Sequence, residues 1–113
     1  MTAVLKLYGC KGCGSAAVEV MLRMAQLPYD YVEAIQWQPE FKRDPALERL
    51  NPWGQVPVLV LDDGSVMTES AAILIWIGER IPGMVPVEPN MRGQFLRWMC
   101  FVPASLYALF SFR

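Results

Sequence analysis

The stretch Asn51-Pro52-Trp53-Gly54-Gln55-Val56-Pro57-Val58 decides the fold of this chain. It leads into Val-Pro-Val-Leu-Val-Leu at 56–61, which has the apolar, β-branched composition of a strand. A proline there is anomalous because it cannot donate a hydrogen bond to a sheet ladder. If Pro57 begins the strand after a cis peptide bond, the backbone groups of Val56 stay free to pair with an extended peptide. The alternative is an ordinary trans proline at a strand end.

The residues after this strand predict a hairpin and a helix. Asp62-Asp63-Gly64-Ser65 precedes a short strand at 66–68, and an Asp-Gly turn between β-rich runs is a strong hairpin signal. The segment from Ser70 to Arg80, whose residues 72–77 are apolar, predicts a largely buried helix, which Ser70 is placed to cap. The cap is one interpretation. In the other, the Ser70 hydroxyl and nearby N–H groups bind a ligand carboxylate, and Glu69 meets an α-ammonium group.

The residues before the opening stretch predict a β-α-β unit. Strands at 4–7 and 29–32 flank an amphipathic helix at 15–26, and such short links favour a parallel pair. The polar segment 36–51, with prolines at 39 and 45, predicts a loop with short helical turns. The first 81 residues therefore order as βαβ followed by ββα.

The last part of the chain predicts a linker and one apolar helix. Prolines punctuate residues 82–89, and Asn90 is a candidate N-cap for a helix over 90–113. No residue from Trp98 to Phe112 is charged, but this run is shorter than the ~20 residues of a membrane span. Apolar residues cover more than one face of this helix, so we expect it to pack against a further part of the chain or another subunit.

Composition excludes several classes of function. The 113 residues include no histidine, which removes histidine-containing metal sites and Ser-His or Cys-His pairs. A net charge of −1 with scattered cations predicts no nucleic-acid partner. We expect no membrane association and, with no signal peptide pattern and only three cysteines, a cytoplasmic location.

Two of the cysteines form a C-x-x-C pair in Leu7-Tyr8-Gly9-Cys10-Lys11-Gly12-Cys13-Gly14-Ser15. The helix that starts at Ser15 directs its free N–H groups at this loop, which favours a thiolate there. A zinc site is excluded because no second pair or histidine completes four ligands, so we expect no metal. The alternative is that both cysteines only fill a tight loop, and Cys100 is expected to serve packing alone.

Together these stretches resemble the amino-terminal, thioredoxin-like domain of the cytosolic glutathione transferase family, in its bacterial form. The most specific residues are Asn51-Pro52-x-Gly54-Gln55-Val56-Pro57 followed by Glu69-Ser70-Ala71-Ala72-Ile73. The resemblance implies an α/β fold with a mixed four-stranded sheet and glutathione as cosubstrate. It also implies that Pro57 is a cis-proline and that Val56 hydrogen-bonds the cysteinyl part of glutathione. Glu69 and Ser70 would hold the γ-glutamyl end, with Gln55 beside them.

The resemblance also divides the chain. Residues 1–81 correspond to the glutathione-binding domain, 82–89 to a linker, and 90–113 to the first helix of the family's all-helical second domain. The rest of that domain is absent, so the sequence resembles a truncated member. The full-length form is expected to be a homodimer.

The catalytic position departs from the family pattern. Alignment back from Leu27-Pro28-Tyr29 places the usual tyrosine, serine or cysteine at Gly12 or Cys13. Cys13 is therefore the first candidate for the catalytic group, with Cys10 and Ser15 beside it.

Three functions remain open from the sequence. In the first, glutathione is ionised at the helix start and attacks a small electrophile. In the second, Cys13 or Cys10 forms a mixed disulfide with a disulfide substrate, and glutathione resolves it. In the third, the chain is a non-catalytic fragment or association module.

Overall fold

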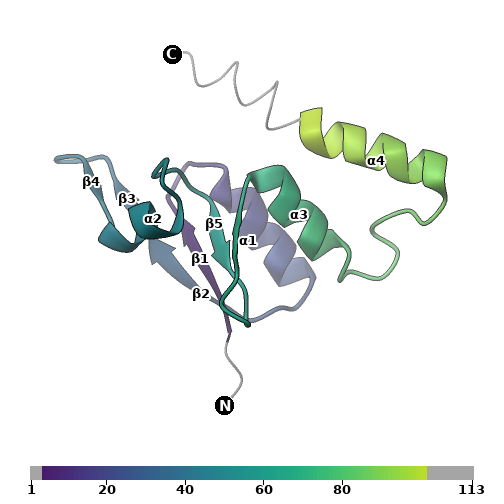
Figure 1. Ribbon diagram of the computed structural model, residues 1–113, viewed down its shortest axis with the longest axis horizontal. Helices are drawn as coiled ribbons and strands as arrows, with labels where there is room; N and C mark the ends of the chain where they lie inside the picture. The colour runs from purple at the N-terminus through teal and green to yellow at the C-terminus, as the bar shows by residue number, and fades with distance from the viewer. Residues whose placement is uncertain (1–3, 102–113) are drawn as a thin grey trace.

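A mixed four-stranded sheet forms the centre of the computed structural model, which describes residues 4–101 (Figure 1). The strand order is β2-β1-β5-β6. The strands are β1 (Leu5–Gly9), β2 (Tyr29–Glu33), β5 (Val58–Val60) and β6 (Val66–Thr68). β2 runs parallel to β1, while β5 is antiparallel to both β1 and β6. This arrangement confirms the predicted mixed four-stranded sheet and its parallel first pair.

Helices α1 (Ser15–Met24) and α3 (Ser70–Gly78) contact each other and cover one face of the sheet. Alternation along a strand sends successive side chains to opposite faces. The face under the two helices is filled by one buried cluster: Leu5, Leu7, Val18, Leu22, Leu59, Ile73 and Ile77. Burying this cluster holds both helix N-termini at one end of the sheet.

The amount of α3 that is buried is smaller than its composition predicts. Ile73, Ile77 and Gly78 are buried, but Leu74, Ile75 and Trp76 are only half-buried. The sheet and α1 cover one side of α3, and Leu74 and Trp76 pack only against the edge of this buried cluster.

The opposite face of the sheet carries a second buried cluster and a short helix. Tyr8 and Val58, which alternate with Leu7 and Leu59, pack there with Cys10, Ala34, Ile35 and Leu47. Helix α2 (Pro45–Leu50) starts where the Asp44 carboxylate accepts a 2.8 Å hydrogen bond from the Ala46 N–H, followed by Pro45 at the first helical position. The predicted short helical turn is thus confirmed in this segment.

The rest of the segment 36–51 differs from the predicted loop. It contains a two-stranded sheet of β3 (Ile35–Gln36) and β4 (Lys42–Arg43), paired antiparallel through Ile35–Arg43 and Gln36–Lys42. Each strand has only two residues, which is too short for an alternating pattern to show in the sequence.

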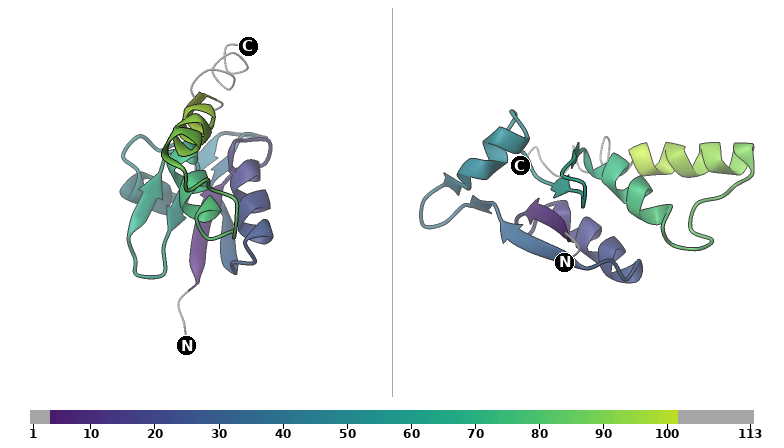
Figure 2. Two further views of the ribbon diagram at one scale, coloured as in Figure 1. Left: turned by 90° about the vertical axis from the view of Figure 1, so that its right-hand side faces the viewer. Right: turned by 60° about the horizontal axis from the view of Figure 1, so that its bottom comes forward.

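Helix α4 (Pro89–Phe101) follows an irregular segment and contacts α3. Figure 2 shows it beyond α3, on the opposite side of the molecule from β3, β4 and α2. The predicted N-cap at Asn90 is wrong, since the Glu88 carboxylate accepts from the N–H groups of Asn90 (3.1 Å) and Met91 (2.8 Å). The predicted helix beyond residue 101 lies outside the described residues. Among the described helices, none has the length and hydropathy needed to cross a membrane.

Candidate functional site

Strand register brings three separate segments to the same end of the sheet. Tyr8 of β1 pairs with Val58 of β5, and Val58 pairs with Thr68 of β6. Pro57 and Glu69 lie one residue beyond Val58 and Thr68, and the Cys10 loop begins two residues beyond Tyr8. Neighbouring strands are ~4.8 Å apart, so these segments lie within about 10 Å across the sheet. The helices α1 and α3 also begin at this end.

The peptide bond between Val56 and Pro57 is cis. Pro57 is buried and Val56 is half-buried against the second cluster. The ladder pairs of β5 begin at Val58, and no hydrogen bond within residues 4–101 uses the backbone N–H or C=O of Val56. These two groups are therefore available to an extended ligand at the sheet end.

The loop before Val56 is held by one buried amide. The Asn51 side chain is 6% exposed; its Nδ2 donates to the Gln55 C=O (3.0 Å) and its Oδ1 accepts from the Trp53 N–H (3.2 Å). The Asn51 C=O also accepts from the Gly54 N–H at 2.8 Å. Asn51 thus fixes the approach to Val56, while the Gln55 side chain is exposed beside it.

Glu69 and Ser70 stand at the start of α3. Ser70 is the first helical residue, so the predicted Ser70 cap is wrong; Glu69 occupies the N-cap and makes no side-chain cap hydrogen bond. Glu69 is exposed and has a φ of 71°, a conformation that non-glycine residues seldom adopt and that clusters at binding sites. The first N–H groups of α3 lack a capping side chain, which makes this helix start suitable for an anion.

The cysteine loop closes the same end of the sheet. Cys10 and Cys13 are joined by a disulfide, with Cys10 2% exposed and Cys13 half-buried. Ser15 is buried, and its Oγ both accepts from the Cys10 N–H and donates to the Cys10 C=O, each at 3.1 Å. The Ser15 hydroxyl is therefore committed to the loop backbone, and Cys13 is the most accessible of the three catalytic candidates.

Two residues of β2 that the sequence did not single out lie beside this loop. The Glu33 Oε1 accepts a 2.7 Å hydrogen bond from the Lys11 N–H, and Glu33 pairs with Gly9 in the register. Burial, followed by the charges of Glu33 and Glu19, raises the pKa of Tyr31 to about 12, so its phenol is neutral near pH 7. The sequence could have pointed to Glu33 through the predicted parallel pairing of β2 with β1. Parallel pairing brings the carboxyl ends of both strands together, so the last residue of β2 lies beside the loop that follows β1.

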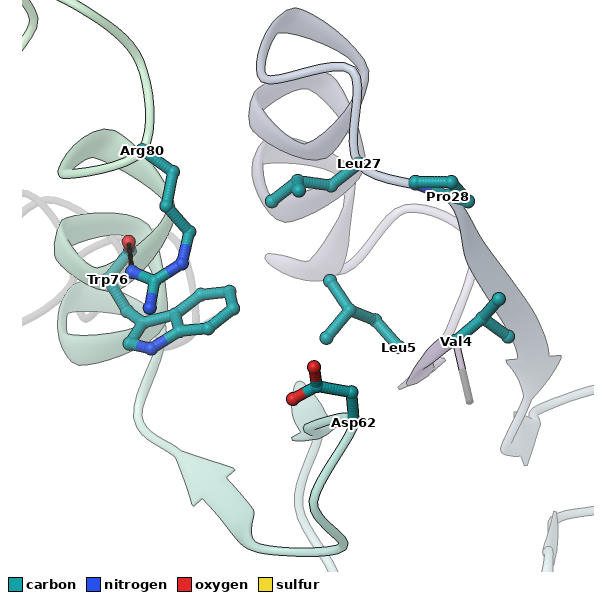
Figure 3. A pocket seen from close by; sticks show the side chains of 7 residues that line it. All are labelled: Val4, Leu5, Leu27, Pro28, Asp62, Trp76 and Arg80. Atoms are coloured by element: carbon teal, nitrogen blue, oxygen red, sulfur yellow. Dashed lines mark hydrogen bonds between the residues drawn. The ribbon is translucent and has the colours of Figure 1, made fainter. Parts of the chain in front are cut away.

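A pocket of about 420 Å³ lies at the opposite end of the sheet (Figure 3). The Arg80 guanidinium lies 3.5 Å from the centre of the Trp76 ring, across from Asp62. Leu5 begins β1 and Asp62 follows β5, which places this pocket away from the Cys10 loop. It is lined by Val4, Leu5, Leu27, Pro28, Asp62, Trp76 and Arg80. Among residues 4–101, no three histidine, cysteine or acidic side chains are grouped so as to hold a metal ion.

The fold defines a thioredoxin-like α/β protein, in which a cysteine loop, a proline before a central strand and a helix start share one sheet end. Within this class, residues 15–80 match the family model for the glutathione S-transferase N-terminal domain. The chain belongs to the glutathione S-transferase family, as the resemblance in its sequence predicts.

Individual relatives agree with this assignment. The chain is 36% identical over 110 residues to the uncharacterized GST-like protein YncG of Escherichia coli K12, covering 96% of this chain and 54% of that protein. A glutathione transferase homologue from Sulfitobacter with bound glutathione superposes with a TM-score of 0.78 at 28% identity, over 94% of this chain and 51% of that one. A sphingomonad glutathione S-transferase complexed with glutathione superposes with a TM-score of 0.79 at 28% sequence identity. The match covers 94% of this chain and 54% of that one. The chain spans about half the length of the curated relatives it matches.

Proposed function

We propose that this chain binds glutathione across the end of the sheet and activates its thiol for attack on a small electrophile. The observation that carries the proposal is the register Tyr8–Val58–Thr68, which aligns the cysteine loop, Val56 and Glu69–Ser70 within reach of one tripeptide. Solved relatives with glutathione bound support the choice of ligand.

Each segment has a distinct role in this proposal. The free N–H and C=O of Val56 pair with the cysteinyl residue as an added strand. The start of α3 and the Ser70 hydroxyl hold the γ-glutamyl carboxylate, while the Glu69 carboxylate pairs with the ammonium group. Gln55 contacts the same end of the ligand. The thiol then lies at the start of α1, which has no acidic residue in its first turn and so favours the thiolate.

Binding is tested with S-methylglutathione, which has the same recognition groups but no free thiol. Calorimetry should show saturable binding that Glu69→Gln and Ser70→Ala each weaken by roughly ten-fold, or ~1.4 kcal/mol. Asp62→Asn, an exposed carboxylate at the other end of the sheet, is the matched control and should bind normally. Absence of saturable binding by the unsubstituted chain would overturn the proposal.

Conjugation is tested with a dinitrophenyl halide as the model electrophile. Initial rates should saturate with glutathione and should fall in the two binding variants in proportion to their affinity. Conjugation should persist in Cys10→Ser, because the attacking sulfur belongs to glutathione. A conjugation rate equal to that of glutathione alone in buffer would show that the chain does not activate the glutathione thiol.

We further propose that residues 1–81 are the glutathione-binding domain, 82–89 a linker and 90–113 part of a helical second domain. None of the α4 side chains at 89–101 is buried, and Met91, Trp98 and Phe101 are exposed, as for a helix that packs against more structure. In its longer form the protein is proposed to be a cytoplasmic homodimer. Limited proteolysis should cut first within 82–88 and leave the sheet domain intact; first cleavage inside the sheet domain would contradict this division.

A further inference from the structure

The two sulfurs of the Cys10–Cys13 disulfide differ in their access to a ligand. Cys10 packs in the second core cluster with 2% of its surface exposed, whereas Cys13 lies half-buried at the edge of that cluster. The same cluster includes Val56, where the proposed glutathione cysteinyl group pairs. A sulfur arriving along Val56 therefore meets Cys13 before Cys10.

Local hydrogen bonds hold Cys10 in place while Cys13 stands at the helix start. The backbone N–H and C=O of Cys10 are both bonded to the Ser15 hydroxyl, and its C=O also accepts from the Cys13 N–H at 3.2 Å. The Cys13 C=O accepts from the Ala16 N–H, which places Cys13 just before the first turn of α1. The Glu33 carboxylate accepts a hydrogen bond from the N–H of Lys11, which lies between the two cysteines, and so also holds the loop. A negative charge on Cys13 is thus stabilised by the helix start.

We propose that Cys10–Cys13 is a thiol–disulfide exchange centre that bound glutathione reduces, with Cys13 as the sulfur attacked and Cys10 as the leaving and resolving sulfur. The proposal rests on the glutathione site proposed above, and it names disulfides as a substrate class for that site. The first electrophile for the activated glutathione thiolate is then a sulfur of the chain itself.

The reduction proceeds in two balanced steps. In the first, the glutathione thiolate forms a bond to the Cys13 sulfur, the Cys10–Cys13 bond breaks, and the Cys10 thiolate leaves and takes a proton from water. In the second, another glutathione thiolate attacks the glutathione sulfur of this mixed disulfide. Glutathione disulfide leaves, and Cys13 becomes a thiolate.

The dithiol then acts on a substrate disulfide of the form R–S–S–R. The Cys13 thiolate bonds to one sulfur and releases the other half as a thiol after protonation. The Cys10 thiolate attacks Cys13, re-forms the Cys10–Cys13 bond and releases the second half. Over a full cycle, two glutathiones are oxidised and one substrate disulfide is reduced.

The direction of attack is tested in the whole chain carrying Cys100→Ser, because Cys100 is a free, exposed thiol that would form adducts of its own. The oxidised protein is mixed with glutathione, quenched with acid at intervals, alkylated and mapped by mass spectrometry. A transient glutathionyl group on the peptide carrying Cys13, followed by the free dithiol, is expected. A glutathionyl group on Cys10 would overturn the proposal. So would a disulfide that glutathione leaves intact in a chain that, in a separate titration, binds S-methylglutathione saturably. Failure of S-methylglutathione to bind would instead overturn the glutathione site.

A matched pair of variants, both also carrying Cys100→Ser, traps the intermediate. In Cys10→Ala no resolving thiol remains, so glutathione disulfide should leave one stable glutathionyl group on Cys13. In Cys13→Ala, the buried Cys10 should react at least roughly ten-fold more slowly. S-methylglutathione binding checks that each variant is folded, and the time course of the unsubstituted pair decides the question if either is not. Equal rates in the two variants would contradict the assigned roles.

Recognition of glutathione and turnover are measured separately. Glutathione should open the disulfide at least roughly ten-fold faster than cysteinylglycine, which has the same thiol without the γ-glutamyl group. Glu69→Gln should reduce that preference while leaving reduction by dithiothreitol unchanged. Hydroxyethyl disulfide should be consumed catalytically, with loss of turnover in Cys13→Ala. Equal rates with both thiols, or turnover without Cys13, would show that this centre is not part of the glutathione site.

Discussion

Gly9 is the residue on which the close approach between β1 and the cysteine loop depends. A Cβ atom added there would lie 2.5 Å from Ser15 Oγ, 2.6 Å from Ser15 Cβ and 3.1 Å from the Tyr31 ring. Ser15 cannot withdraw easily, because it is buried and bonded to both backbone groups of Cys10. We expect Gly9→Ala to lower the free energy of unfolding by about 1–3 kcal/mol, measured by urea denaturation.

The control for this substitution is Gly93→Ala in helix α4. A Cβ at Gly93 meets no atom within 4 Å, and alanine is favoured over glycine in helices by roughly 0.5–1 kcal/mol. This variant should be neutral or more stable. If Gly9→Ala behaved in the same way, Ser15 would not occupy the space above Gly9.

Asn51 links stability to the proposed binding site. Truncation in Asn51→Ala removes the partners of the Gln55 C=O and the Trp53 N–H, with an expected loss of about 1–3 kcal/mol. Because the loop leads directly to Val56, affinity for S-methylglutathione should fall as well. Asn90→Ala is the control, since its exposed side chain makes no hydrogen bond within residues 4–101. Unchanged stability and affinity in Asn51→Ala would show that the loop needs no such support.

Tyr31 predicts how stability changes at high pH. Its pKa is raised from 10.0 to about 12, chiefly by burial and then by the charge of Glu33, so folding favours the neutral phenol. That contribution is complete below pH 10 and is lost as the pH rises toward the folded-state pKa. The difference between phenolate absorbance titrations of the native chain and Tyr31→Phe should show a midpoint near 12. Tyr31→Phe should also flatten the loss of stability over this range, and a difference midpoint at 10 would contradict the assignment.

At the scale of elements, strong local patterns predicted most of the fold. Strand β6 and the start of α1 lie where the sequence places them, and the Asp-Gly turn closes with a 2.8 Å hydrogen bond from the Leu61 N–H to the Ser65 C=O. Strands β3 and β4 were not predictable, because two-residue strands held by pairing with each other leave no periodic signal.

The candidate site was predictable in its parts and less so in its bonding. The segments around Cys13, Pro57 and Glu69 could be found from motifs, and their convergence follows from strand order. The Cys10–Cys13 bond could not be deduced, because spacing alone does not distinguish a bonded from a free pair. Nor could the burial of Ser15, which depends on the absence of a side chain at Gly9.

Helix α4 depends on a carboxylate that precedes it. Glu88 accepts hydrogen bonds from the N–H groups of Asn90 and Met91, so Glu88→Ala should destabilise the start of the helix by about 1 kcal/mol. Native-state hydrogen exchange should show faster exchange in the first turn of α4 and little change in β1. Glu88→Asp keeps a shorter carboxylate that still suits an N-cap and should restore much of the protection. Equal protection in Glu88→Ala would show that contacts with α3 alone hold the helix.

Two possible ligand positions lie at opposite ends of the sheet. The proposed glutathione site lies beyond Tyr8, Val58 and Thr68, and the pocket of Figure 3 lies beyond Leu5 and Leu61. Each end carries a tryptophan. Trp53, 82% exposed, stands in the loop before Val56, whereas Trp76 lines the pocket under Arg80.

This arrangement predicts which tryptophan responds to glutathione. Binding of S-methylglutathione beside Val56 should perturb the fluorescence of Trp53, which is two residues from Gln55, and leave that of Trp76 unchanged. Trp53→Phe should therefore abolish the titration signal while calorimetry still detects binding, and Trp76→Phe should retain the signal. The opposite pattern would place the ligand in the pocket at the Leu5 end. A ligand in that pocket would lie at the other end of the sheet from Cys13, and the strand register would then no longer support the proposed function.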